Sequence, residues 1–370
     1  MALGVTQGTL SGKDPREILR NYYLRAGDGQ LTVVTTTLDL TTVYTLPAEV
    51  GVPGAVVVSG ETFLKVVEGV TAPQVTLATD GTGVVLTAGS FEARLATMGA
   101  EDFPKDPFFS GECQAVDRPE LLAGLRRISL ALCKDESRKQ LNNVRVDKNS
   151  LTSSDGRVTV VVSVKTGVTG EVLVPSRAIK RLTDVLADAR TPTVEVAHEG
   201  GHLLFRFGGV TFSTRLGAGA FPDVRGRVLK PTENNPLVLR IHREGLRAAV
   251  ARVAATASKR GRSVRLDLQR GRCSLLAQDW SGNSSSESVE CDFGMMAPDG
   301  RLMECTPTQV FFDHQYLASV LATLTGELVE FRMAQQIRVP VRVEEPGLVV
   351  LMARLSAAQA SGGEAPAEET

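Results

Sequence analysis

One stretch of the chain has residue types and spacing that could bind a catalytic metal. His198-Glu-Gly-Gly-His202 matches the His-Glu-x-x-His pattern of zinc hydrolases, in which Glu199 would activate a water molecule. That pattern requires a helix, because positions i and i+4 then bring both imidazoles to one face. Two glycines lie inside the stretch, and residues of alternating polarity flank it. We therefore predict a β-hairpin turn without metal, and a zinc hydrolase is the weakest alternative that we retain.

Other residues that could do chemistry lack the partners that catalysis requires. Asp135-Glu136 beside Arg138 is typical of surface charge, and the four histidines have no Ser or Cys neighbours that suggest a nucleophilic triad. The five cysteines are scattered and include no Cys-x-x-Cys pair, which favours reduced thiols in the cytosol. The sequence thus predicts a non-catalytic protein with no cofactor and no bound metal.

Composition limits how the chain could bind nucleic acid or a membrane. With 41 basic and 42 acidic residues the net charge is −1, so any DNA contact must come from a local basic face. Aromatic residues make up only 5%, which argues against base stacking as the main binding mode. No apolar run approaches the roughly 18 residues of a membrane span. The N-terminus also lacks a signal peptide, so we expect a cytoplasmic protein.

The chain repeats a pattern of strands, a helix and a hairpin three times. The copies begin at Leu31, Leu151 and Cys273, which are 120 and 122 residues apart. So long a period indicates tandem domains that each bury their own core. We predict an α+β fold of three similar domains, each with two helices packed on antiparallel sheets. The expected boundaries are residues 1–117, 118–240 and 241–355, followed by a disordered acidic tail over residues 356–370.

The predicted helices have an apolar stripe and a basic opposite side. Residues 119–134, the segment after Pro175-Ser176, and residues 244–259 show this pattern. Charge segregated on equivalent helices of a neutral chain favours a bound polyanion, although a solvated charged face is the simpler alternative. The basic residues concerned are Arg126, Arg127, Lys180, Arg181, Arg247, Arg252 and Lys259.

Four segments in order resemble the bacterial DNA polymerase III beta subunit family, the sliding clamps. They begin at Asp135, Leu151, Gly217 and Val349, and the resemblance covers about residues 12–355. It implies a ring-forming head-to-tail homodimer, whose inner helices surround duplex DNA and contact phosphates without reading sequence. The implied partners are double-stranded DNA, the DNA polymerase III alpha subunit, the clamp loader and repair proteins with clamp-binding motifs. A diverged clamp paralogue with altered partners remains the alternative.

The resemblance also implies a pocket between the second and third domains for short peptides with apolar anchors. Gly156 and Pro222 fit ordinary turns equally well, and either Arg157 or Val158 takes the place of a family arginine. The implied pocket residues are Leu141, Ser154, Gly156, Arg157, Val158, Pro222, Arg227, Val228, Val349, Leu351, Met352 and Arg354.

Further contacts are implied for DNA and for the second copy. DNA would meet Lys13 and the loop residues Arg138, Lys139 and Gln140, and the dimer interface would include Ala255 and Thr256. The chain departs from the family before Gly12, where only about a dozen residues stand. We therefore expect that the first domain either begins upstream of Met1 or lacks an inner helix.

Overall fold

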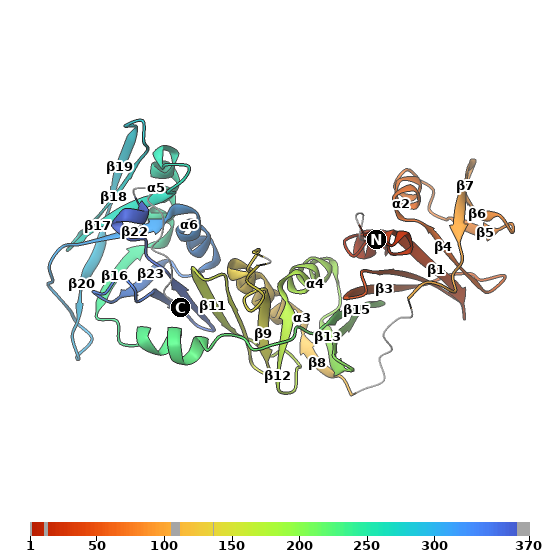
Figure 1. Ribbon diagram of the computed structural model, residues 1–370, viewed down its shortest axis with the longest axis horizontal. Helices are drawn as coiled ribbons and strands as arrows, with labels where there is room; N and C mark the ends of the chain where they lie inside the picture. Colours follow the sequence, from red (N-terminus) through yellow and green to blue (C-terminus); the bar gives the residue numbers. More distant parts are fainter. Residues whose placement is uncertain (1, 11–13, 105–111, 136, 361–370) are drawn as a thin grey trace. The chain divides into compact units, whose positions relative to one another are not determined.

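The protein is described by a computed structural model that covers residues 2–10, 14–104, 112–135 and 137–360 (Figure 1). The chain divides into two compact units. Among the described residues, no helix combines the length and apolar character needed to cross a membrane. Unit 1 is Met1–Leu125, Val146–Asn149 and Lys165–Ala218, and unit 2 is Arg126–Arg145, Ser150–Val164 and Gly219–Thr370.

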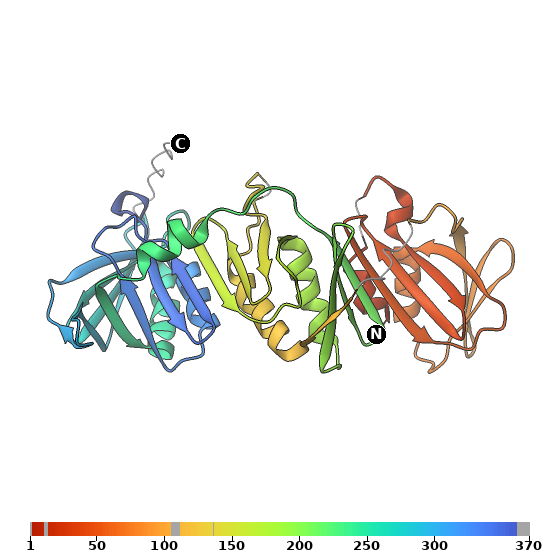
Figure 2. The same cartoon turned by 90° about the horizontal axis from the view of Figure 1, so that it is seen from below.

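Unit 1 is built on one large antiparallel sheet, whose first strands run side by side in Figure 2. The strand order is β5-β6-β7-β4-β1-β2-β3-β15-β14-β13-β8. Strand β12 (Glu171–Pro175) also belongs to this unit. The strands of the sheet are β1 (Asn21–Gly27), β2 (Gln30–Thr36), β3 (Leu40–Pro47), β4 (Gly54–Ser59), β5 (Thr76–Thr79), β6 (Gly83–Ala88), β7 (Phe91–Met98), β8 (Gln114–Asp117), β13 (Thr193–Glu199), β14 (His202–Phe207) and β15 (Val210–Arg215).

The helices of unit 1 bury their apolar side chains against this sheet. Phe63 of α2 meets Tyr22 of β1 edge to face, with ring centroids 5.7 Å apart, in a cluster that includes Leu24, Val33 and Val58. The N-terminal segment, for which a start upstream of Met1 or a missing inner helix was expected, forms the short helix α1, which packs on β2 and β3 and buries Val5. The helices are α1 (Ala2–Gln7), the 3-10 turn Glu17–Arg20, α2 (Gly60–Glu68) and α4 (Ser176–Asp188).

Unit 2 has two antiparallel sheets. One contains the strand order β10-β11-β25-β24-β23-β16-β20-β21, and the other has the order β19-β18-β17-β22. Strand β9 (Asn143–Asp147) begins in unit 2 and ends in unit 1. The strands of the two sheets are β10 (Ser150–Ser154), β11 (Val158–Ser163), β16 (Leu237–His242), β17 (Ser263–Gln269), β18 (Arg272–Gln278), β19 (Ser284–Val289), β20 (Cys291–Met296), β21 (Leu302–Met303), β22 (Thr308–Asp313), β23 (Leu328–Met333), β24 (Val341–Glu345) and β25 (Leu348–Met352).

Two helices of unit 2, α5 and α6, lie side by side (Figure 1). They cover the sheets with fully buried side chains, such as Leu246 of α5 and Leu317 of α6. A one-turn helix, α7, lies within the segment predicted to be a disordered tail, and residues 361–370 lie outside the described residues. The helices are α3 (Arg118–Ile128, which starts in unit 1), α5 (Arg243–Val253), α6 (His314–Thr323), α7 (Ala357–Ala360), the 3-10 turns Ser129–Ala131, Lys230–Thr232 and Ala254–Thr256, and the π-helical turn Arg225–Leu229.

The predicted α+β class is confirmed, and the predicted order of elements recurs along the chain. Each of α2, α4 and α6 begins directly where a strand ends, at Gly60, Ser176 and His314, and α3 and α5 follow β8 and β16 in the same way. The sequence from Gln336 to Val343 predicts a strand, but residues 336–339 form a turn and β24 begins only at Val341. Trp280 is 69% exposed in the chain and so does not lie in a core.

Candidate functional site

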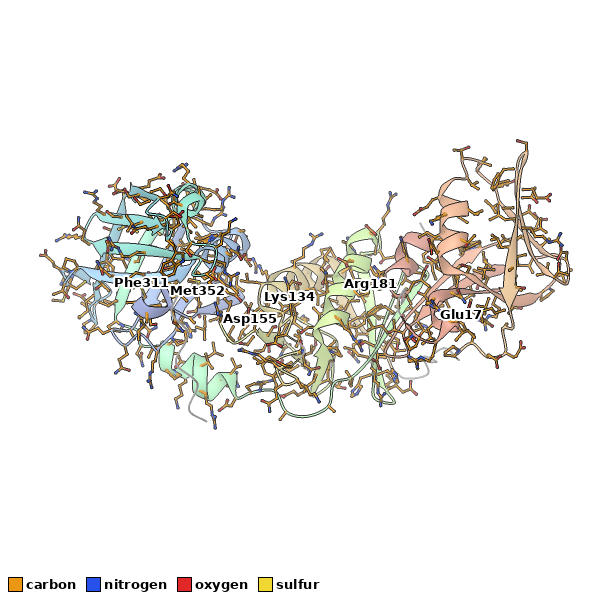
Figure 3. All side chains as sticks on the ribbon, turned by 45° about the horizontal axis from the view of Figure 1, so that its top comes forward. Glu17, Lys134, Asp155, Arg181, Phe311 and Met352 are labelled. Carbon is orange, nitrogen blue, oxygen red and sulfur yellow. The ribbon has the colours of Figure 1, made fainter. Side chains whose placement is uncertain are left out.

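A cavity of about 230 Å³ lies in unit 2, where the β10–β11 turn, the start of α6, the end of β25 and α7 meet. The antiparallel pairing of β11 with β25 sets Val158 opposite Met352, and the amide of Ala353 donates to the carbonyl of Arg157 at 2.8 Å. Figure 3 labels Asp155 and Met352 in this region. The lining residues are Arg138, Gly156, Arg157, Asp313, Tyr316, Met352, Ala353, Arg354, Leu355 and Gln359.

The β10–β11 turn is fixed by the carboxylate of Asp155. The backbone amides of Arg157 and Val158 donate to Asp155 Oδ1 at 2.9 and 2.8 Å, which is an Asx turn. Gly156 has φ +88°, and a Cβ there would collide with the guanidinium of Arg138. Gly156 is therefore both a turn residue and part of the cavity wall.

The start of α6 supplies a buried carboxylate and a phenol. Asp313 is 5% exposed, and its Oδ1 caps the helix by accepting from the amide of Gln315 at 2.9 Å. Its Oδ2 lies 3.1 Å from Arg262 Nη2 and 3.8 Å from Arg157 Nη1. The Tyr316 hydroxyl donates to Asp155 Oδ2 at 2.7 Å. Burial and, to a smaller extent, this bond to a carboxylate raise the pKa of Tyr316 to about 12, so the phenol is a neutral donor.

Three arginines flank the cavity, and apolar side chains form part of its wall. Arg354 donates from Nη2 to the carbonyl oxygens of Gln336 and Val339, which holds the turn before β24, and burial lowers its pKa. Met352 and Leu355 supply apolar surface beside the guanidinium groups of Arg138 and Arg157. This mixture suits a short peptide with an apolar anchor whose polar or acidic groups meet arginine.

The structure places four of the twelve predicted pocket residues on the cavity wall: Gly156, Arg157, Met352 and Arg354. Val158 and Leu351 are core residues with 0% and 1% exposure, and Ser154 is buried with its hydroxyl 2.8 Å from that of Thr159. The role of the residues off this wall in peptide binding stays a prediction. Those that do not line the cavity are Leu141, Ser154, Val158, Pro222, Arg227, Val228, Val349 and Leu351.

Sequence reasoning missed Asp313, Tyr316, Leu355 and Gln359 on the cavity wall. Two of them carried a local signal. Asp313 directly precedes a helical segment, as an N-cap residue does, and Ser356-Ala-Ala-Gln359 is a capping-box sequence that predicts a helix start. The other two depend on tertiary contacts, because Tyr316 reaches Asp155 of the β10–β11 turn and Leu355 follows β25, which pairs with β11.

The residues predicted to contact DNA differ in how accessible they are. Arg252 pairs with Glu287, with Nε 2.7 Å from Oε2, and Arg247 pairs with Glu244, so part of their charge is neutralised within unit 2. Arg127 is half-buried, and Lys13 lies outside the described residues. The exposed members of the set are Arg126, Arg138, Lys139, Gln140, Lys180, Arg247, Arg252 and Lys259.

The prediction that Arg181 points outward from α4 is wrong. Its Nη2 donates to the carbonyl oxygen of Val5 in α1, its side chain is half-buried, and desolvation lowers its pKa. The next basic position, Lys180, does remain exposed. Arg181 is thus engaged in holding α1 to α4 within unit 1.

The two predicted dimer-interface residues lie in the 3-10 turn after α5. Ala255 is exposed, whereas Thr256 turns its hydroxyl inward, 2.6 Å from that of Ser285 in β19. Strand β19 is the edge of the smaller sheet of unit 2.

The predicted hairpin at His198–His202 is confirmed. Glu199 pairs with His202 and His198 pairs with Leu203, so the two histidines point to opposite faces of the hairpin and could not share a metal ion. Gly200 and Gly201 form the turn with φ +57° and +77°. Across the described residues, no group of three or more His, Cys, Asp or Glu side chains could hold a metal.

Comparison with known proteins agrees with the fold. The family "DNA polymerase III beta subunit, N-terminal domain" matches residues 1–107. The beta sliding clamp of Caulobacter vibrioides is 27% identical over 351 residues, covering 90% of each chain. The beta sliding clamp of Vibrio cholerae is 25% identical over 339 residues, covering 88% of each.

Solved structures give the same result. A crystal structure of the Caulobacter crescentus beta sliding clamp aligns over 96% of both chains with a TM-score of 0.86 and 25% identity. A Bartonella birtlesii clamp bound to griselimycin, at 20% identity, has the same fold with a TM-score of 0.86. Together, these matches in sequence and structure support the bacterial DNA polymerase III beta subunit family, the beta sliding clamps, as the family of this chain.

Proposed function

We propose that this sliding clamp forms a homodimeric ring around duplex DNA in the cytoplasm and tethers replication and repair proteins to it. Exposed basic residues on α3, α4 and α5, among them Arg126, Lys180 and Arg252, support phosphate contacts. Contacts of this kind carry no base readout and therefore permit sliding. Membership of the clamp family and a net charge of only −1 fit a protein that encloses DNA without binding it tightly.

We also propose three clamp domains over residues 1–117, 118–240 and 241–355. The support is the recurrence of a helix directly after a strand, in β4–α2, β12–α4 and β22–α6. Two copies of the chain would then give six domains in the ring.

The second copy would meet the smaller sheet of unit 2 at its edge. Strand β19 leaves one side of that sheet open, and the exposed Ala255 lies in the turn packed against it. An open strand edge is a ready surface for pairing with another chain.

We propose that the cavity beside β11 and β25 is the tethering site. Its presence is the observation that supports the proposed partners. Its combination of Met352 and Leu355 with Arg138, Arg157 and Arg354 suits short linear motifs with leucine or phenylalanine anchors. The proposed partners are the DNA polymerase III alpha subunit, the clamp loader and repair proteins with such motifs.

The test is fluorescence anisotropy with a labelled Gln-Leu-Ser-Leu-Phe peptide. Arg354→Ala removes a cavity wall and releases the turn at Gln336 and Val339, so we expect about tenfold weaker binding. Arg301→Ala, an exposed arginine paired with Asp299 in the β20–β21 hairpin, is the matched control and should bind normally.

Leu351→Ala serves as a second control, because it damages the core without removing a residue of the cavity wall. Because Leu351 is buried and off the cavity, this change should lower the free energy of unfolding by about 2–5 kcal/mol. If the wild-type chain does not bind the peptide, the tethering proposal is wrong, and a paralogue with other partners becomes the better description.

A further inference from the structure

A second cavity of about 410 Å³ lies in unit 2 between β17, β18, β22 and α7. Its wall includes Phe311, Leu276 and Trp280, the one tryptophan of the chain. Trp280 is 69% exposed, although tryptophan is a residue that proteins usually bury over most of its surface. A large exposed aromatic side chain on a cavity rim is typical of an interaction site.

The loop that carries Trp280 is held rigidly in place. Asp279 Oδ1 accepts from the amides of Ser281 and Asn283, both at 2.9 Å, and Asp279 Oδ2 accepts from Asn283 Nδ2 at 2.8 Å. These bonds lower the pKa of Asp279, and the bond from the Asn283 side chain contributes most. Gly282 completes the turn with φ +87°. Because the loop is ordered in advance, burial of Trp280 by a ligand would cost little conformational entropy.

Helix α7 contributes to the walls of both cavities. Gln359 of α7 lines the first cavity, whereas Ala357 and Ala360 line the second. The segment between β25 and α7 also connects the two walls, since Leu355 on the first wall donates its amide to the carbonyl of Phe311 on the second, at 2.8 Å. The two cavities are therefore neighbours on the surface of unit 2, joined by α7 and by this backbone bond.

The charged groups of the second cavity are already satisfied within unit 2. Asp279 is saturated by its own loop, and Arg265 Nη2 lies 3.0 Å from Asp267 Oδ2. The apolar surface open to a ligand is that of Trp280, Phe311 and Leu276, and the uncharged side chains of Ser258, Ser263 and Gln278 also line the cavity. The complementary group is thus an aliphatic or aromatic side chain and not an ion.

We propose that this cavity is an additional anchor site for the peptides of the partner proteins. It would take an apolar side chain that lies outside the short motif bound in the first cavity. The inference rests on the proposed tethering function and adds to it a specificity determinant, because only partners with a suitably placed flanking residue would use Trp280.

The experiment uses Trp280 as its own reporter in the full-length chain. The probes are the pentapeptide Gln-Leu-Ser-Leu-Phe and two ten-residue peptides that add five residues, one of them leucine, before or after it. We expect one extended peptide to shift Trp280 emission to shorter wavelengths and to bind about tenfold tighter than the pentapeptide. Trp280→Ala should remove that gain and leave pentapeptide affinity unchanged, both measured by anisotropy of labelled peptides. Leu328→Ala, an equally exposed apolar position of unit 2, should keep the gain.

Four results would overturn the inference. Extended peptides that bind without moving Trp280 emission, or that keep their gain in Trp280→Ala, would disprove it while leaving the tethering site intact. An emission shift that depends on protein concentration without peptide would show that Trp280 contacts a second copy instead. Absence of pentapeptide binding would overturn the proposed function and this inference together.

Discussion

At the scale of single residues, the hydroxyl of Tyr316 connects α6 to the β10–β11 turn. It donates to Asp155, the carboxylate that also accepts from the amides of Arg157 and Val158. One acidic side chain therefore joins the turn and the helix on two sides of the cavity.

Tyr316→Phe removes this bond without changing the shape of the ring. We expect a loss of about 1 kcal/mol in the free energy of unfolding at neutral pH, measured by urea denaturation. Folding raises the pKa of Tyr316 from 10.0 to about 12, so the neutral phenol is favoured and its stabilisation is complete below pH 10. That stabilisation is lost as the pH rises from 10 towards 12, and the variant should lose less stability than wild type over this range. An identical pH dependence in both proteins would contradict the assignment.

The residues of the cavity were only partly predictable from the sequence. Gly156 and Met352 were found through local motifs, because each lies in a segment whose residue order resembles the clamp family. Tyr316 was missed because its role depends on Asp155, and no local pattern links two residues so distant in sequence. Arg181 was misplaced because helical periodicity assigns a direction to a side chain but does not reveal that α1 lies beside it.

At the scale of elements, α7 is a short helix with a well-formed start. The Ser356 amide donates to Gln359 Oε1 at 2.9 Å, and the Gln359 amide donates to Ser356 Oγ at 3.2 Å. This reciprocal pair is a capping box, and it matters because a single helical turn is marginal without such support.

Ser356→Ala should loosen α7 by removing one of these bonds. We expect a cost of about 1 kcal/mol, which corresponds to roughly fivefold faster amide hydrogen exchange over residues 356–360. Mass spectrometry of peptic fragments measures it, with Ser284→Ala at an exposed position of β19 as the control. Equal exchange in the two variants would mean that packing, and not the cap, holds α7 in place.

Elements with strong periodicity were predicted well, and those set by tertiary contacts were not. Leu121, Leu125 and Ile128 lie on one buried side of α3, and the predicted helix 119–134 ends at Ile128, followed by a 3-10 turn over Ser129–Ala131. The alternation after Gln336 predicted a strand. Pro340 lacks an amide donor, and Arg354 binds the carbonyls of Gln336 and Val339, so those residues turn instead.

At the scale of the whole molecule, the proposed ring requires two copies of a 39.5 kDa chain. Light scattering after size-exclusion chromatography should therefore give about twice that mass. Ala255→Arg places a charge at the exposed turn beside β19, and it should yield a monomer. Ala251→Arg, also exposed but within α5, is the matched control and should remain dimeric. A wild-type monomer, or a dimer unaffected by Ala255→Arg, would contradict the proposed interface.

The three-copy architecture was visible in the sequence because each copy repeats its own order of strands and helices. The way in which strands from different copies share a sheet was not visible. Pairing of β15 with β3, for example, depends on the register of Thr211 with Val43, which no local pattern specifies.

The position of β25 bears on how the chain acquires its fold during translation. Strand β25 lies in the interior of the larger sheet of unit 2, between β11 and β24, yet it is made almost two hundred residues after β11. Until Leu348–Met352 emerges from the ribosome, β11 exposes an unsatisfied strand edge on the nascent polypeptide. Completion of unit 2 must therefore wait for the final stage of synthesis, when chaperones that shield open strand edges would matter most.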